Sequence, residues 1–454
     1  MSSLSIAGHE IRRLLRDRAL PVLLGLLVVL AAYAAWNGSA WVGQREAAIS
    51  LINAEEQDAR DRSRGFVGKA PSVLPRVQPV LPPGPMAALS IGQADAYPYT
   101  ADVVALGDRT QLLRHVWSDI GNPAVQAAGR FDLAFVIVFL LPLVILATTF
   151  DLWSRECERG ITALVLSQPI AAGRLIAVKA LARGAIVLLP ALAIIIAVAV
   201  AAGSGATRPS GLAVLALIVL AYGSFWLALA VLIGCFARRT TEAAIAAGAL
   251  WLLIVVMAPS LVLAAVNLMV PPPSQMQLAT ALKAQLADTA RQQQLRHAAA
   301  SPATRSPAPR IADAVRVAYA DLVQADQAIA PLIAAHTEAE DARRQALDRA
   351  RLLLPSVAVQ DALDRLAGSD ADRALAFQQQ VLAYWHARRQ LHKDYLDRDV
   401  PQTLAEYDAL PRFEFQDTAG ALQRGVLIDL AALAVATLLL LIAAWSMRRR
   451  LATP

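Results

Sequence analysis

The residues best suited to chemistry lie in one short charged run, SRECERG, from Ser154 to Gly160. Glu156 and Glu158 lie near its start, and basic side chains alternate with them. A serine is a common N-cap, and the helix dipole stabilises carboxylates in a first turn. The run therefore predicts a helix of about three turns that starts with Ser154 as its N-cap.

The residues that follow would give this helix an apolar face. Ile161, Leu164 and Val165 are spaced three and four apart, so they would lie on one side of a helix. Gly160 would allow another backbone to approach closely, because glycine has no side chain. Such a helix, joined directly to two apolar blocks, could pass force from a docked partner to them. The alternative is an interfacial helix that rests on lipid headgroups.

No other constellation predicts catalysis or metal binding. The six histidines include no pair at i, i+4, and neither H-E-x-x-H nor G-x-S-x-G occurs. We expect His386 and His392 to be surface residues of a helix. The only cysteines, Cys157 and Cys235, are predicted to be small apolar side chains without a redox or metal role. The sequence thus predicts no catalytic, cofactor-binding or metal site.

Apolar blocks on both sides position the charged run. The chain of 454 residues is 57% hydrophobic and only 17% charged, whereas soluble domains average about 25% charged residues. Six blocks are long enough to cross a hydrocarbon layer of about 30 Å as helices, and lipid offers the backbone no hydrogen-bond partners. We therefore predict an all-α polytopic membrane protein with six transmembrane helices and a mainly helical extracytoplasmic domain.

Short basic flanks set the predicted orientation, because Lys and Arg in short loops mark the cytoplasmic side. They place both termini in the cytoplasm, and they account for the net charge of +6 without a nucleic-acid-binding face. The predicted segments are a cytoplasmic arm at 1–19, spans at 20–36, 133–150, 184–203, 211–236, 243–270 and 426–446, a cytoplasmic coupling region at 151–183, extracytoplasmic segments at 37–132 and 271–424, and a cytoplasmic tail at 447–454.

Some details within these segments are also predicted. A polar helix over 44–64 would continue the first span outward, and a long amphipathic helix over 311–354 has a candidate break at Pro331. Pro259 predicts a bend in the fifth span. Asp429 and Glu242 lie in or beside spans, where acidic residues are functional candidates, but their positions near interfaces favour helix-end or packing roles.

The stretch from Asp151 to Arg183, DLWSRECERGITALVLSQPIAAGRLIAVKALAR, resembles the signature region of the ABC-2 class of export permeases. The residues that match its pattern are Ser154, Arg155, Glu156, Glu158, Gly160, Thr162, Ser167, Pro169, Arg174 and Lys179, with Ile161 as an apparent insertion. The stretch from Arg351 to Phe377 resembles the large extracytoplasmic insert, of unknown function, that one subgroup carries between its fifth and sixth spans.

The resemblance implies a permease subunit of an ATP-driven exporter in the bacterial inner membrane, which is not itself an enzyme. The implied ATPase-coupling residues are Ser154, Arg155, Glu156, Glu158, Arg159, Gly160, Thr162 and Leu164. The motif G-x-x-x-x-G-K-[ST] is absent, so ATP and Mg would be bound by a separate ABC ATPase, present in two copies. A second permease, identical or related, would complete the assembly.

Further contacts are expected with membrane lipid and, through 271–424, with a periplasmic partner, but not with nucleic acid. A second hypothesis is a mechanotransmission or scaffold subunit that drives a periplasmic partner without transport. A third, a membrane-bound enzyme that uses the outer domain, has no motif to support it.

Overall fold

The structure is a computed structural model that describes residues 3–447 apart from 70–71, 106, 108–129, 161–171, 204–208, 300–310, 399 and 418. Within these residues the chain is helical and has no strand, only two isolated β-bridges, Val77–Val103 and Val80–Thr100. Six helices are long and apolar enough to cross a membrane. The predicted fold class, all-α with six transmembrane helices, is confirmed.

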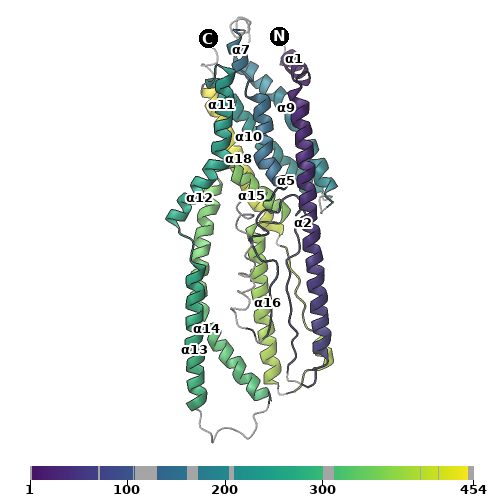
Figure 1. Ribbon diagram of the computed structural model, residues 1–454, viewed down its shortest axis with the longest axis vertical. Coiled ribbons are helices and arrows are strands. Elements are labelled where there is room, and N and C mark those ends of the chain that lie inside the picture. Colours follow the sequence, from purple (N-terminus) through teal and green to yellow (C-terminus); the bar gives the residue numbers. More distant parts are fainter. Residues whose placement is uncertain are drawn as a thin grey trace.

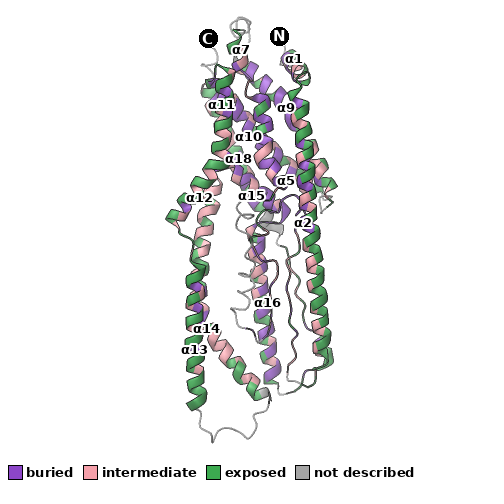
Figure 2. Ribbon diagram, viewed as in Figure 1, coloured by how far each residue is buried: buried purple, intermediate pink, exposed green. Residues whose placement is uncertain are grey.

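The spans form one bundle (Figure 1). Their helices are α2 (Ala19–Arg64), α5 to α6 (Leu133–Thr149), α9 (Ala172–Ala201), α10 (Pro209–Phe236), α11 to α12 (Thr240–Met269) and α18 (Ala419–Ser446). The second and fourth spans are central, with 67% and 56% of their apolar windows buried, whereas the fifth and sixth are only 11% and 17% buried (Figure 2). The outer spans therefore leave wide apolar faces for lipid or another subunit.

The second span contains a π-helical segment, η1 (Val136–Leu140), between α5 (Leu133–Phe135) and α6 (Leu141–Thr149). Pro142 follows it and has no N–H to donate to the carbonyl of Val138. The Tyr222 hydroxyl, fully buried in the fourth span, donates to that carbonyl at 3.0 Å. A side chain from a neighbouring span thus replaces the hydrogen bond that the proline removes.

The fifth span repeats this arrangement. It consists of α11 (Thr240–Trp251), the π-helical segment η2 (Leu252–Met257) and α12 (Ala258–Met269). Pro259 cannot donate to the Ile254 carbonyl five residues earlier, and the Ser356 hydroxyl does so at 3.0 Å. The irregularity predicted from Pro259 is therefore a π segment whose open carbonyl is bonded from outside the span.

Long helices extend from one end of the bundle, which we call the arm end; α7 (Ser154–Glu158) and both marked termini lie at the opposite end, the α7 end (Figure 1). The arms are the second half of α2, α13 (Gln275–Ala299), α14 (Ile311–Arg351) and α16 (Ala371–Asp397). As predicted, α2 continues beyond the first span, to Arg64. The predicted break at Pro331 is wrong, because α14 runs through it.

Two shorter helices join the arms to the rest. Helix α17 (Leu404–Asp408) contacts the tip of α2, where the Tyr407 hydroxyl donates to the Arg60 carbonyl at 2.7 Å. Helix α15 (Pro355–Ala367) buries Val359, Ala362, Leu363 and Ala367 in the same core as the spans. This helix, between α14 and α16, therefore connects the arms to the bundle.

Candidate functional site

The predicted coupling helix begins at Ser154, but its described part is short. Helix α7 contains five residues, Ser154–Glu158, and its N-cap position is occupied by Trp153. The predicted N-cap role of Ser154 is wrong, because its hydroxyl is buried and has no hydrogen-bond partner among the described residues. Thr162, Leu164 and the rest of the expected apolar face lie outside the described residues.

Gly160 ends this helix through its backbone conformation. Its φ is +67°, in the left-handed region that L side chains rarely adopt. A Cβ added there would meet nothing within 4 Å in the described structure. The predicted reason for glycine, close approach of another backbone, is therefore not seen among the described residues, which instead show a turn at the end of α7 that requires a positive φ.

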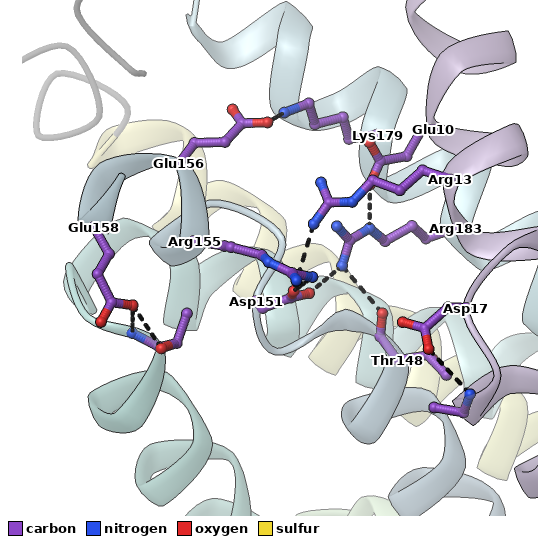
Figure 3. Close-up of polar contacts among 12 residues, drawn as sticks. Glu10, Arg13, Asp17, Thr148, Asp151, Arg155, Glu156, Glu158, Lys179 and Arg183 are labelled. Carbon is purple, nitrogen blue, oxygen red and sulfur yellow. Dashed lines mark hydrogen bonds and ion pairs between the residues drawn. The ribbon is translucent and has the colours of Figure 1, made fainter. Parts of the chain in front are cut away.

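Glu158 links α7 to the fifth span (Figure 3). Its carboxylate accepts from the backbone N–H of Thr240 at 3.1 Å and from the Thr240 hydroxyl at 2.6 Å. Thr240 is the first residue of α11, so the carboxylate also lies at the positive end of a helix dipole. A substitution of the exposed Glu158 would therefore directly affect the first residue of this span.

Glu156 and Arg155 link α7 to the two spans that flank it. Glu156 forms an ion pair with Lys179 of α9, and that ammonium group lies 6.0 Å from the centroid of the Trp153 ring. Arg155 pairs with Asp151 one turn earlier, at 3.2 Å. The alternating charges that define the run in the sequence thus face different neighbours and hold α7 between spans.

The guanidinium of Arg183 is deeply buried at this end, with 3% of its side chain exposed. It donates to Glu10 of α1 (Ser3–Leu15) at 2.6 Å and to the Thr148 carbonyl at 3.1 Å, and it pairs with Asp151 (Figure 3). Arg13 of α1 also approaches Asp151, at 3.9 Å. One side chain therefore joins α1 to the ends of the second and third spans.

Glu10 is not among the residues predicted from the sequence, although the amphipathic pattern of α1 could have indicated that it lies on a buried face. Its apolar residue Ile6 packs in a small core with residues of the second, third, fourth and sixth spans. Glu10 follows one turn later on the same face, where a carboxylate must find a buried partner. Cys235 belongs to this core and Cys157 packs against it.

Burial divides the predicted coupling residues into two groups. Glu158, Arg159 and Gly160 are exposed and are available to a partner. Ser154 is fully buried, and Arg155 and Glu156 are partly buried among the contacts that hold α7 in place. The described part of the site therefore has an exposed tip and a base that is held in place by contacts with its neighbours.

Three residues outside this site were also assessed from sequence. Glu242 accepts from the backbone N–H of Arg239 at 3.3 Å, so its predicted helix-end role is confirmed. Asp429 has 2% exposure and lies in a charged cluster at the arm end, a setting that its nearness to an interface did not predict. The prediction that His392 is a surface residue is wrong: it is buried, which lowers its pKa, and its Nδ1 lies 2.8 Å from the Ser72 hydroxyl.

Comparison with known proteins decides the family. A model described as ABC-2 family transporter protein matches residues 4–444, nearly the whole chain. The chain belongs to the ABC-2 transporter family. No curated protein matches it.

Membership of the ABC-2 family agrees with the fold. The protein is a multi-pass membrane protein and the membrane-embedded permease component of an ABC transporter. ABC-2 permeases are in general non-catalytic and work with an ABC ATPase, so the family implies such a partner for this chain. The described residues contain no group of three or more His, Cys, Asp or Glu side chains that could hold a metal ion.

Proposed function

We propose that this ABC-2 permease couples ATP hydrolysis by separate nucleotide-binding subunits to movement of cargo across or out of the bacterial inner membrane. The observation that carries the proposal is the attachment of α7. Its exposed tip ends in Glu158, Arg159 and Gly160, while its polar contacts reach the third span through Lys179 and the fifth through Thr240. An ATPase that pushes on this tip would move several spans together.

The α7 end is the cytoplasmic end in this proposal, because the basic residues of the short flanks gather there. ATP and Mg are bound by the partner ATPase, in two copies. A second permease subunit, identical or related, covers part of the apolar surface of the fifth span, which is only 11% buried within one chain. The remaining apolar surface faces lipid.

The test is ATPase activity of the complex reconstituted in lipid, with wild-type, Glu158→Ala or Gly160→Trp permease. Both variants alter the tip of α7, and we expect them to assemble with the ATPase but to lose stimulation of hydrolysis by cargo or partner. Glu338→Ala is the matched control, because Glu338 is an exposed carboxylate on arm α14. Hydrolysis that is indifferent to both tip variants would contradict the coupling role.

A second candidate function is mechanotransmission to a periplasmic partner without transport. The long arms favour it, since α17 contacts the tip of α2 and the two would move together. Transport of cargo by proteoliposomes that contain only the permease and its ATPase would count against this alternative. Loss of all activity unless a periplasmic protein is added would support it.

A further inference from the structure

A cluster of buried charges joins the arms to the sixth span. Asp361 of α15 pairs with Arg351, the last residue of α14, at 2.8 Å and with Arg365 of its own helix at 2.5 Å. Asp429 of α18 lies against both guanidiniums, at 3.3 Å from Arg351 and 4.0 Å from Arg365. These four residues, which we call the outer cluster, therefore connect two extracytoplasmic helices to one span.

The outer cluster also reaches the next arm. Arg365 pairs with Asp372 in the first turn of α16 at 2.6 Å. The Arg365 side chain lies directly on the backbone of α18, where a Cβ added to Gly425 would come within 2.7 Å of it. Arg365 is thus held between α16 and the start of the sixth span, and neither helix can shift alone without displacing it.

Asp429 depends on this arrangement for its charge balance. Its side chain is 1% exposed, neither carboxylate oxygen accepts a hydrogen bond from an N–H or hydroxyl donor among the described residues, and the Asp361 carboxylate also lies against it. The two guanidiniums are the cations that the structure places against it. Movement of α18 away from α15 would leave a buried carboxylate without a counter-charge, which is strongly unfavourable. The sixth span and α15 are therefore expected to move together.

The arms continue this connection outward. Arg389 of α16 forms an ion pair with Asp326 of α14, and the Arg316 guanidinium of α14 donates to the Leu396 carbonyl at the far end of α16 at 3.1 Å. Because these contacts hold α14 and α16 against each other, a displacement of α15 would move both helices together.

We propose that Asp429 is a positioning residue that makes the sixth span and α15 one moving body, so that arms α14 and α16 move with that span during the ATP cycle. The proposal rests on the proposed function, since it requires ATP-driven movement of the spans. Asp429 does not contact cargo in this scheme; it determines whether movement in the membrane reaches the extracytoplasmic arms.

The experiment measures the distance between α16 and the middle of α2 in the complete ATPase–permease complex. Spin labels are attached to Gln44→Cys and Ala387→Cys, both exposed positions, after Cys157 and Cys235 are replaced by alanine. Distances are recorded with and without trapped nucleotide. We expect a nucleotide-dependent shift in the parent protein, and loss of at least about half of that shift in Asp429→Asn, with the ATPase still bound.

Two further variants make the result specific. Arg351→Gln breaks the same contact from the arm side and is expected to reduce the shift as well, even if Asp429→Asn fails to fold. Asp341→Asn is the matched control, because Asp341 pairs only with Arg344 of its own helix in the described contacts, at 3.1 Å, and should leave the shift unchanged.

Different results would contradict the role of Asp429 and the proposed ATP coupling. A full shift in both Asp429→Asn and Arg351→Gln would overturn the role of Asp429 while leaving ATP coupling intact. No shift in the parent protein, although its ATPase is bound and active, would overturn the proposed coupling and this inference together.

Discussion

The two ends of the bundle each contain a buried charge network, and the networks differ in how completely their groups are paired. At the α7 end, Arg183 has its charge matched by Glu10 and Asp151 and also donates to a backbone carbonyl. At the arm end, the Asp429 carboxylate has ion-pair contacts with Arg351 and Arg365 but no hydrogen bond among the described residues.

This difference separates a network that stabilises the fold from one that mainly positions two helices. Removing a member of a fully hydrogen-bonded network leaves several groups unsatisfied, whereas an incompletely bonded carboxylate contributes little to stability. In the proposed function, the network at the α7 end must withstand the push of an ATPase, while the outer cluster must keep the sixth span and α15 together as they move. The following experiments test that contrast.

The largest expected effect is that of Arg183→Gln. It leaves Glu10 and Asp151 buried without their guanidinium, so we expect a loss of about 3–5 kcal/mol in the free energy of unfolding. Thermal unfolding of the purified permease measures it. Arg12→Gln is the control, because Arg12 is an exposed arginine of α1, the helix that carries Glu10, and should change stability by no more than about 0.5 kcal/mol. If Arg183→Gln and Arg12→Gln lowered the free energy of unfolding equally, the Arg183 network would not hold these helices together.

The second prediction concerns pH at the arm end. Asp364 of α15 is buried beside the Ser90 hydroxyl, which donates to it at 2.6 Å, and burial raises its pKa from 3.8 to about 8. The folded protein then holds a proton that the unfolded chain releases above about pH 4. This contribution to stability is complete below pH 4 and is lost as pH rises through about 8.

Melting temperatures measured between pH 5 and 9 check this prediction, with the pH values chosen to bracket the raised pKa. Wild-type permease should become less stable as pH rises, and Asp364→Asn should show a flatter profile. An unchanged slope in the variant would assign the pH dependence to another group, for instance Asp132, whose pKa is also raised by burial.

The third prediction returns to the α7 end. Gly160→Ala places a side chain at a φ of +67°, which costs about 1–2 kcal/mol locally and should weaken coupling before it weakens the fold. Gly173→Ala is the matched control, because Gly173 lies in helix α9 with nothing within 4 Å of an added Cβ. If both variants keep full stimulation of the ATPase, the turn at Gly160 is not needed for coupling.

The smallest expected effect on stability is that of Asp429→Asn, less than about 1 kcal/mol, because it removes a buried charge that lacks hydrogen bonds. Its thermal unfolding should lie close to wild type even though arm movement is lost. A destabilisation as large as that of Arg183→Gln would show that the two networks are equivalent, and the contrast would fail.

The spans could be predicted because a long apolar block indicates a membrane-spanning helix whichever elements pack against it. The second span is an example: residues 133–150 were recognised from hydropathy alone, and α5 to α6 cover 133–149. The π segment inside it was not predicted, because it depends on Tyr222, a residue from another span that bonds the carbonyl left open by Pro142.

The candidate site was predictable in part, for a similar reason. Glu156 and Glu158 were identified from their spacing, but their partners Lys179 and Thr240 are set by how three spans pack. Asp429 was visible as an acid near a span, yet its partner Arg351 comes from an outer segment whose docking the sequence does not encode locally. The residue types indicated which side chains could form polar contacts, but only the tertiary structure showed which partners they contact.

Helix α2 has a consequence for the amplitude of movement. It is continuous over 46 residues, so at about 1.5 Å per residue it is a rod of roughly 70 Å. A tilt of about 5° around its N-terminal end would carry its tip sideways by roughly 6 Å, more than one helical pitch of about 5.4 Å. Because the Tyr407 hydroxyl is bonded near that tip, a small change of angle in the membrane would carry α17 sideways by a similar distance.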